Sequence, residues 1–356
     1  MLNPRLMAEA ASNLGFSCIP TFEGSIRRLE ERKASSRFAP YLVDLRQAYT
    51  APKPILTIDG ASVCSPGNIS AIVGAPKSKK TFLATALIGS MLSFRKHGHA
   101  FENVGSSPMQ NVLWLDTEQG MLHVRKVLER LHRLVGIYKP DKPTVDPRVE
   151  VITMREFEAV ERRKALRELI EIHTPTLVVI DGIADLQRNT NDLEESDSLV
   201  DELMTLSSMY HCHILCVLHA NPGTDKARGH LGSSLQRKSE TVIYVHKVGE
   251  RSVVEPQFCR NEPFERFAFS INEEGLPVLC DLPAETGSEN NLLVQLLESE
   301  YGGAVERTVL TNKLQESYGL GRAAAAMRIS RALNKGLLIA KENLVCLPTT
   351  QLGEQP

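Results

Sequence analysis

Gly74-Ala75-Pro76-Lys77-Ser78-Lys79-Lys80-Thr81 follows the phosphate-loop pattern G-x-x-x-x-G-K-[ST] at every fixed position but one. Lys79 stands where the pattern has its second glycine. Residues 69–73 predict a buried strand before this loop, and the chain from Thr81 onward predicts a helix after it. In such a unit, backbone N–H groups and the positive end of the helix converge on phosphate oxygens. The stretch therefore predicts a site for a nucleoside triphosphate.

Each position of the loop has an expected role. Lys80 is expected to reach the β- and γ-phosphates, and the Thr81 hydroxyl is expected to bind Mg²⁺. The predicted nucleotide-binding residues are Gly74, Ala75, Pro76, Lys77, Ser78, Lys79, Lys80, Thr81 and Phe82. Glycine tolerates a positive φ and lysine does so poorly, so Lys79 predicts an altered or strained backbone. A chance strand-turn-helix with a basic loop is the alternative to the whole motif.

Composition bounds the class of protein. The 356 residues suggest about two domains. The formal net charge is −2, so any contact with nucleic acid must come from a local basic patch. The sequence contains neither a signal-peptide pattern nor an apolar run long enough for a membrane span, so we expect a cytoplasmic protein without a membrane partner. The seven cysteines are scattered, which suits reduced thiols.

Apolar runs alternate with helix-length segments between about residues 54 and 280. This alternation predicts an α/β domain over 51–280, with a mostly parallel sheet flanked by helices on both faces. The last three runs lie too close together for intervening helices and predict an antiparallel extension. The expected strands are 69–73, 111–115, 149–153, 176–180, 213–218, 241–246, 252–259 and 266–270.

A strand that ends in a carboxylate supplies the metal ligand that a phosphate loop needs. Leu177-Val178-Val179-Ile180-Asp181 is such a strand, and it places Asp181 at the sheet edge where open α/β folds bind ligands. Asp181 is therefore expected to hold Mg²⁺ together with Thr81. An aspartate that merely begins the turn at Gly182 is the alternative.

Strand 111–115 also ends in acidic residues, Asp116 and Glu118, before an amphipathic helix that begins near Met121. This order between the two motifs resembles the RecA-like ATPases, and within them the RepA-type and DnaB-like helicases of plasmids and mobile elements. The resemblance covers about residues 54–280 and implies that Glu118 is the general base that activates water. Asp116 is the competing candidate, and a solvated acidic turn is the alternative to both.

The resemblance also gives a role to the end of strand 213–218. His219 matches a histidine that senses the γ-phosphate in RepA-type helicases. A zinc site around Cys216 and His219 competes with this role, but alternation along a strand sends the two side chains to opposite faces. The long polar loop 223–234 is similar to the Arg-Gly-Ser-Ser segment of that group, which implies contact with single-stranded DNA; a plain surface loop is the alternative.

DnaB-type helicases complete the site with an arginine from the neighbouring subunit. The segment Cys259-Arg260-Asn261-Glu262-Pro263-Phe264 resembles the strand-turn that carries it. Arg260 is the first candidate for this catalytic role and Arg228 the second, with Arg237 and Lys238 left open. A plain surface arginine is the alternative. Such a role requires a homo-oligomer, for which a hexamer is one candidate form.

The segments outside the core suggest further units. Residues 1–50 are expected to form a helical lead-in of unknown role, 281–289 a linker, 290–348 a second domain and 349–356 a disordered tail. The second domain predicts three helices and a hairpin, an order that resembles a winged helix-turn-helix module. Its third helix bears four cations without an acidic residue: Arg322, Arg328, Arg331 and Lys335. Duplex DNA is the expected ligand, against a merely solvated helix face or a protein-docking surface.

The expected activity is Mg²⁺-dependent ATP hydrolysis coupled to DNA transactions, as in a RepA-type helicase-like or loader ATPase. An ATP-switched DNA-binding regulator or assembly factor with slow hydrolysis is the alternative. A degenerate loop that binds nucleotide without turnover is a third interpretation, and the presence of Glu118 and Asp181 argues against it.

Overall fold

The computed structural model describes most of the chain. The described residues are 31, 36–93, 101–106, 110–141, 145–221, 227–283, 289–318, 322–334, 336–341 and 343–348. Most of the expected N-terminal lead-in, the middle of the expected linker and the expected tail therefore lie outside the described residues. The chain divides into two compact units, Met1–Ala51 and Pro52–Pro356, and each is described by itself.

The first unit is described mainly over residues 36–51. It contains a short 3-10 helix, η1 (Ala39–Tyr41), in which Pro40 fits the first turn because a missing N–H costs nothing there. The chain leaves this helix in extended conformation at Leu42. The side chains of Tyr41 and Leu45 are 81% and 98% exposed, so this segment has no core of its own among its described residues.

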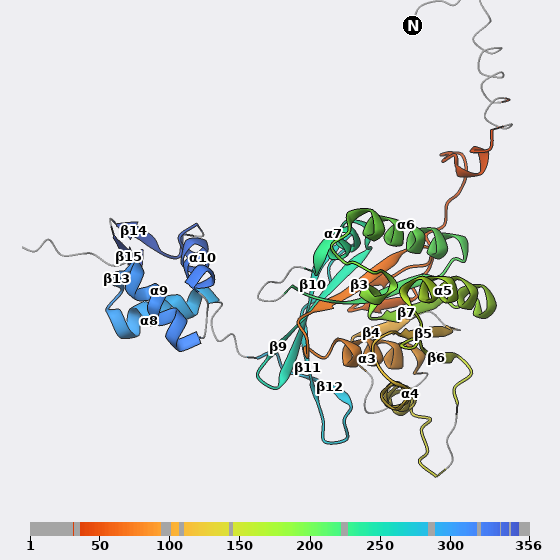
Figure 1. The fold of residues 1–356 in the computed structure, drawn as a ribbon, viewed down its shortest axis with the longest axis horizontal. Coiled ribbons are helices and arrows are strands. Elements are labelled where there is room, and N and C mark those ends of the chain that lie inside the picture. Colours follow the sequence, from red (N-terminus) through yellow and green to blue (C-terminus); the bar gives the residue numbers. More distant parts are fainter. Residues whose placement is uncertain are drawn as a thin grey trace, which may run out of the picture. The chain divides into compact units, whose positions relative to one another are not determined.

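A nine-stranded sheet in the order β12-β11-β10-β9-β3-β8-β7-β5-β6 forms the centre of the second unit (Figure 1). The six strands from β9 to β6 run parallel, and β10, β11 and β12 extend the sheet antiparallel from β9. The bounds are β3 (Ile69–Gly74), β5 (Val112–Asp116), β6 (Val149–Thr153), β7 (Leu177–Asp181), β8 (His213–His219), β9 (Thr241–Val248), β10 (Arg251–Cys259), β11 (Phe267–Ile271) and β12 (Pro277–Cys280). The α/β class, the mostly parallel sheet and the antiparallel extension are confirmed.

Helices cover both faces of this sheet (Figure 1). α3 (Lys80–Leu92) and α4 (Met121–Val135) pack on one face, and α5 (Ala159–His173), α6 (Leu193–Met209) and α7 (Gly229–Lys238) pack on the other. Alternate residues of each strand enter opposite cores; on β3, Ile72 joins the first core and Ala71 joins the second. Local signals begin the helices: Glu158 and Glu161 form a capping box on α5, and Asp192 accepts from the backbone of Glu195 on α6.

Three features differ from the sequence-based expectation. The polar stretch 223–234 is not a loop throughout, because α7 begins at Gly229 and buries Leu231 and Leu235 against the second core. β9 belongs to the parallel part, paired with β3, rather than to the antiparallel extension. A second small sheet, in the order β2-β1-β4, was not expected; it is formed by β1 (Leu56–Ile58), β2 (Ala61–Cys64) and β4 (Val104–Ser106).

The C-terminal part of the second unit has a hydrophobic cluster of its own, within residues 293–347. Its elements are α8 (Glu289–Tyr301), β13 (Ala304–Glu306), α9 (Arg307–Tyr318), α10 (Arg322–Asn334), β14 (Ile339–Lys341) and β15 (Leu344–Cys346). The strands form a three-stranded antiparallel sheet in the order β13-β15-β14. The expected helices and hairpin are therefore present, together with a strand, β13, that was not expected.

Within the described ranges, no helix is both long enough and apolar enough to cross a membrane.

Candidate functional site

The phosphate-loop pattern lies between β3 and α3, at the carboxyl edge of the parallel strands. The ammonium nitrogen Nζ of Lys80 donates to the carbonyl oxygens of Gly74 at 3.0 Å and Ala75 at 3.1 Å. It also lies 3.0 Å from Nδ1 of His219. Burial lowers the pKa of Lys80 to about 8, and the carboxylates of Glu118 and Asp181 oppose this shift. The Lys80 ammonium is thus held by neutral carbonyl groups, which charged phosphate oxygens could replace as acceptors.

Strand β9 fits against the start of the loop closely enough to require glycine. A Cβ atom on Gly74 would lie 2.3 Å from the carbonyl oxygen of Val245, a contact that backbone cannot relieve cheaply. The β9–β10 hairpin touches the loop at two further points. Ser252 Oγ donates to the carbonyl of Ser78 at 3.2 Å, and Lys79 Nζ donates to the carbonyl of Glu250 at 3.1 Å.

Lys79 adopts the left-handed conformation, with φ 70° and ψ 34°. The backbone at this position therefore has the positive φ that favours glycine, and a lysine in this conformation is strained. Lys77 also has a positive φ, of 65°. The substitution at position 79 keeps a glycine-like backbone and adds a side chain that reaches the hairpin.

Thr81 and Asp181 meet across the sheet edge. Thr81 Oγ1 donates to Asp181 Oδ2 at 2.8 Å. Burial, followed by the charge of Asp116, raises the pKa of Asp181 to about 7. Hydroxyl and carboxylate oxygens are the ligands that Mg²⁺ prefers, and a buried carboxylate gains stability from a nearby cation. Thr81 and Asp181 therefore fit Mg²⁺ and would hold it.

Glu118 and Asp116 have different environments although they are two residues apart. The side chain of Asp116 is fully buried, and its oxygens accept from the backbone N–H groups of Glu118 and Gln119 and from Gln119 Nε2. Asp116 thus holds the turn after β5. Glu118 lines the pocket, and its contact with His219 lowers its pKa despite partial burial, so it is an ionised carboxylate able to accept a proton.

His219 connects the loop lysine to this carboxylate. Because an ammonium can only donate, Nδ1 of His219 accepts from Lys80 and the ring proton is on Nε2. Nε2 lies 3.4 Å from Glu118 Oε1. The strand end predicted to sense phosphate therefore contacts both groups that are expected to act on the γ-phosphate.

A pocket of about 400 Å³ joins these residues. One wall consists of Lys77, Lys79, Lys80, Thr81, Asp181 and His219. A second wall comes from one face of α4, through His123, Lys126, Val127 and Arg130. The sequence-based prediction did not include these α4 residues; their spacing of i, i+3, i+4 and i+7 beyond Glu118 is a signal that could have found them.

Two further polar residues, one in the pocket lining and one beside it, were not predicted. Gln119 lines the pocket, and its backbone carbonyl accepts from Thr153 Oγ1. Asp185 accepts from Thr117 Oγ1 at 2.9 Å, and burial raises its pKa. Both positions follow strand ends, but neither residue belongs to a motif by type, so sequence alone offered no reason to choose them.

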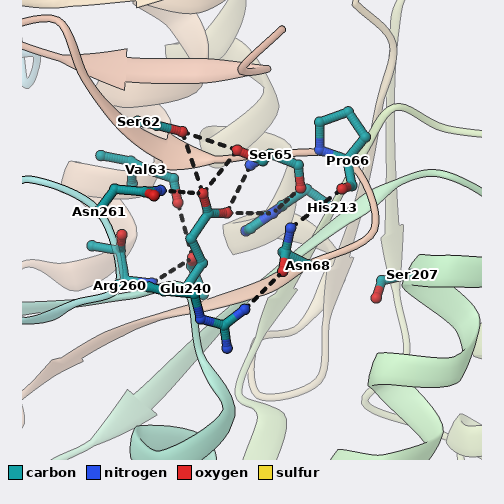
Figure 2. A network of polar contacts seen from close by, with 12 residues as sticks. Ser62, Val63, Ser65, Pro66, Asn68, Ser207, His213, Glu240, Arg260 and Asn261 are labelled. Atoms are coloured by element: carbon teal, nitrogen blue, oxygen red, sulfur yellow. Dashed lines mark hydrogen bonds and ion pairs between the residues drawn. The ribbon is translucent and has the colours of Figure 1, made fainter. Parts of the chain in front are cut away.

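The two arginine candidates lie at opposite edges of the sheet. The backbone N–H of Arg228 donates to the carbonyl of His219 at 3.1 Å, so Arg228 adjoins the nucleotide edge. Arg260 lies at the other edge, where its guanidinium donates to Asn68 Oδ1 at 3.2 Å (Figure 2). It also donates to the carbonyl of Lys238 at 3.1 Å. Of the two cations left open, Arg237 pairs with Asp197 at 2.9 Å. A role in trans stays a prediction for each.

A buried carboxylate organises the edge that carries Arg260 (Figure 2). Glu240 is 3% exposed and accepts from Ser65 N and Oγ and from Asn261 Nδ2. His213, at the first position of β8, donates from Nδ1 to the carbonyl of Ser65 at 2.8 Å. Burial lowers the pKa of His213 to about 4, so the ring is neutral at neutral pH.

A zinc site was the competing interpretation near His219. Cys216 is fully buried in the second core, whereas His219 faces the pocket. Among the residues that the structure describes, no group of three or more His, Cys, Asp or Glu side chains could hold a metal ion. Thr81 and Asp181 supply only two protein ligands, which suits an ion whose remaining coordination positions are filled by phosphate oxygens and water.

The chain resembles known proteins in sequence and in fold. A family model described as an AAA domain matches residues 33–225, which is more than half of the chain. The matched range contains the phosphate loop, Glu118, Asp181 and His219, and ends before Arg228. A crystal structure of the RadB recombinase is similar at 16% sequence identity and a TM-score of 0.40, covering 62% of this chain and 93% of that chain. No curated protein matches the sequence.

Proposed function

This chain belongs to the AAA domain family, and from its P-loop ATPase domain we propose a Mg²⁺-dependent ATPase whose turnover drives a DNA transaction. Nucleoside triphosphate hydrolysis is the activity that the family implies, and ATP with Mg²⁺ is its usual substrate. The coupling to DNA, in the manner of a RepA-type helicase-like or loader ATPase, rests on the resemblance of residues 54–280 to RecA-like ATPases.

The observation that carries the proposal is the convergence of five side chains, from the ends of four strands, on one pocket. Lys80 and Thr81 follow β3, Glu118 follows β5, Asp181 ends β7 and His219 ends β8. These strands are neighbours in the parallel sheet, so their carboxyl ends form one edge. A cation, a hydroxyl, two carboxylates and an imidazole at such an edge suit in-line attack of water on a phosphoryl group.

Each side chain has a distinct task in this reaction. Lys80 leaves its carbonyl acceptors for the β- and γ-phosphate oxygens, and Thr81 with Asp181 would hold Mg²⁺, which supplies neutralisation of phosphate charge when bound. Glu118 accepts the proton of the attacking water. His219, which touches both Lys80 and Glu118, transmits the loss of the γ-phosphate to the chain beyond β8.

The C-terminal elements support the DNA part of the proposal. Three helices and a three-stranded sheet in the order α8-β13-α9-α10-β14-β15 suit a winged helix-turn-helix module. We assign it duplex DNA as ligand because the sequence of α10 carries cations and no acidic residue. Single-stranded DNA is the proposed ligand of the core loops, in a homo-oligomer where Arg260 or Arg228 acts on a neighbour's nucleotide.

ATP turnover with and without single-stranded DNA, measured across a range of protein concentrations, tests the proposal. We expect turnover that rises with single-stranded DNA and grows faster than linearly with protein concentration, because a residue in trans requires assembly. Lys80→Ala should abolish nucleotide binding. If turnover is slow and does not respond to single-stranded DNA, and the full chain binds duplex DNA, the protein is an ATP-operated switch rather than a motor. Absence of turnover under every condition would refute the enzyme.

A further inference from the structure

Arg130 lies beside the nucleotide pocket with part of its hydrogen-bonding capacity unused. Its guanidinium carbon is 3.7 Å from the centroid of the Phe82 ring, so the two planar groups are in contact. Nε and Nη1 are buried and have no hydrogen-bond partner among the described residues. Buried donors without acceptors are rare in folded proteins and call for an explanation. Burial also lowers the pKa of Arg130 to about 10, which leaves it charged at neutral pH.

The position of Arg130 separates it from the groups that hold phosphate. Lys80 and Thr81 belong to the loop and the first turn of α3, whereas Arg130 is on the third turn of α4. Phe82 lines the same pocket as Lys80 and Thr81, and its ring lies under the guanidinium of Arg130. The pocket that contains the loop continues along Phe82 and α4, so a triphosphate seated on the loop has room to extend its nucleoside along this wall.

The wall that α4 contributes is chemically suited to a nucleoside. Val127 gives it an apolar surface, and the Phe82–Arg130 pair gives it a planar surface on which an aromatic ring can stack. The described α4 residues that line the pocket include two cations, Lys126 and Arg130, and no carboxylate. Ring nitrogens, carbonyl oxygens and ribose hydroxyl oxygens are acceptors that such donors can bind.

We propose that Arg130, supported by Phe82, contacts the base and ribose of the bound nucleotide and sets the affinity for this half of the ligand. The inference rests on the proposed function in one respect, that the ligand of the phosphate loop is a nucleoside triphosphate. The competing explanation is that Arg130 only packs on Phe82 to hold α4 against α3.

Two probes that differ only in the nucleoside separate these explanations. ATP and inorganic tripolyphosphate, each with Mg²⁺, are titrated calorimetrically into wild-type protein and Arg130→Met. We expect Arg130→Met to weaken ATP binding roughly tenfold, because one charge-assisted contact is lost, and to leave tripolyphosphate binding within about twofold of wild type. Arg125→Met is the matched control, since Arg125 is on the same helix, is 68% exposed and pairs with Glu129 away from the pocket.

The remaining results each decide the matter. Unchanged ATP affinity in Arg130→Met would overturn the proposal in favour of packing, and equal losses for ATP and tripolyphosphate would make Arg130 a phosphate ligand instead. Arg130→Lys, which keeps the charge and loses the plane, should weaken ATP selectively as well; it replaces the Met variant if thermal melting shows that the latter fails to fold. If wild-type protein binds ATP no more tightly than tripolyphosphate, the contact with base and ribose is refuted but the phosphate site is not. If it binds neither probe, the nucleotide site itself is refuted.

Discussion

Lys80 and His219 are joined by a hydrogen bond of 3.0 Å between Nζ and Nδ1. The bond fixes the histidine tautomer, because the ammonium must donate, and it directs the Nε2 proton toward Glu118. A residue at the end of one strand thus touches both the cation that is expected to hold the phosphate and the base that is expected to activate water. Three groups that the chain places far apart in sequence are thus connected by direct contacts.

His219→Ala should lower turnover by about 10- to 100-fold while changing ATP affinity little, since it removes the link but neither the cation nor the base. It should also change the pH dependence. The contact with His219 lowers the pKa of Glu118, so its loss raises that pKa. A base is inactive when protonated, so the acid limb of the turnover profile should move to higher pH. An unmoved acid limb, measured by steady-state kinetics from pH 4 to 8, would contradict the link.

Glu118→Gln and Asp116→Asn should fail in different ways. Glu118→Gln should bind ATP as wild type and lose turnover by about 100-fold or more, because the proton acceptor is gone. Asp116→Asn should instead destabilise the fold by about 1–3 kcal/mol, because Oδ1 can keep both backbone bonds while the new amide nitrogen faces Gln119 Nε2, which now donates to Oδ2. Single-turnover kinetics and urea unfolding measure the two effects. Full activity in Glu118→Gln would return the role of base to Asp116.

Lys79→Gly should be more stable than Lys79→Ala by about 1 kcal/mol. Both variants lose the hydrogen bond to Glu250, but alanine keeps the left-handed strain whereas glycine removes it. The comparison isolates the backbone because the lost side-chain contact is the same. Thermal and urea unfolding of the two variants give the difference directly, and equal stabilities would mean that position 79 is unstrained.

Sequence patterns predicted the architecture well because buried parallel strands are continuous apolar runs with polar ends. The runs at 69–73, 149–153 and 213–218 lie within a residue or so of β3, β6 and β8. The motif residues Lys80, Thr81 and Asp181 could be chosen for the same reason, since their residue types and strand-end positions are local. These properties can be read from the sequence without knowing the tertiary contacts.

The unpredicted features depend on contacts between distant segments. Leu231 and Leu235 give α7 too few apolar positions to stand out from its polar surroundings, and the helix is stable because the second core covers them. Arg130 is an ordinary helix arginine until α4 packs beside Phe82. The lining of the pocket could not be predicted because it is formed by the packing of α4 against α3, rather than by any motif.

Acid should destabilise the protein partly through His213. Its pKa is lowered by burial to about 4, against about 6.5 in the unfolded chain, so between these pH values the unfolded state binds more protons. The free energy of unfolding therefore falls as pH decreases from about 6.5 to 4, by on the order of a few kcal/mol at most from this group. Below about pH 4 both states are protonated and the group adds no further loss.

His213→Asn isolates this contribution, because its amide can still donate to the carbonyl of Ser65 but does not titrate. Urea unfolding at pH 4, 5, 6 and 7 should give a flatter dependence in this variant than in wild type. His230→Asn, at an exposed position outside the Glu240 network, is the control and should keep the wild-type slope. A variant His213→Asn with the wild-type slope would mean that another group senses acid.

The three contacts of the β9–β10 hairpin with the phosphate loop make the hairpin a natural place for a reporter. Gly74 pairs with Val245 of β9 so closely that an added Cβ would not fit, and Ser78 and Lys79 are hydrogen-bonded to Ser252 and to the carbonyl of Glu250. A rearrangement of the loop that breaks or moves these contacts would therefore be felt in the hairpin. A fluorophore attached through Glu250→Cys, at a side chain that is 90% exposed, would read out occupancy from outside the pocket and turn the chain into an optical nucleotide sensor.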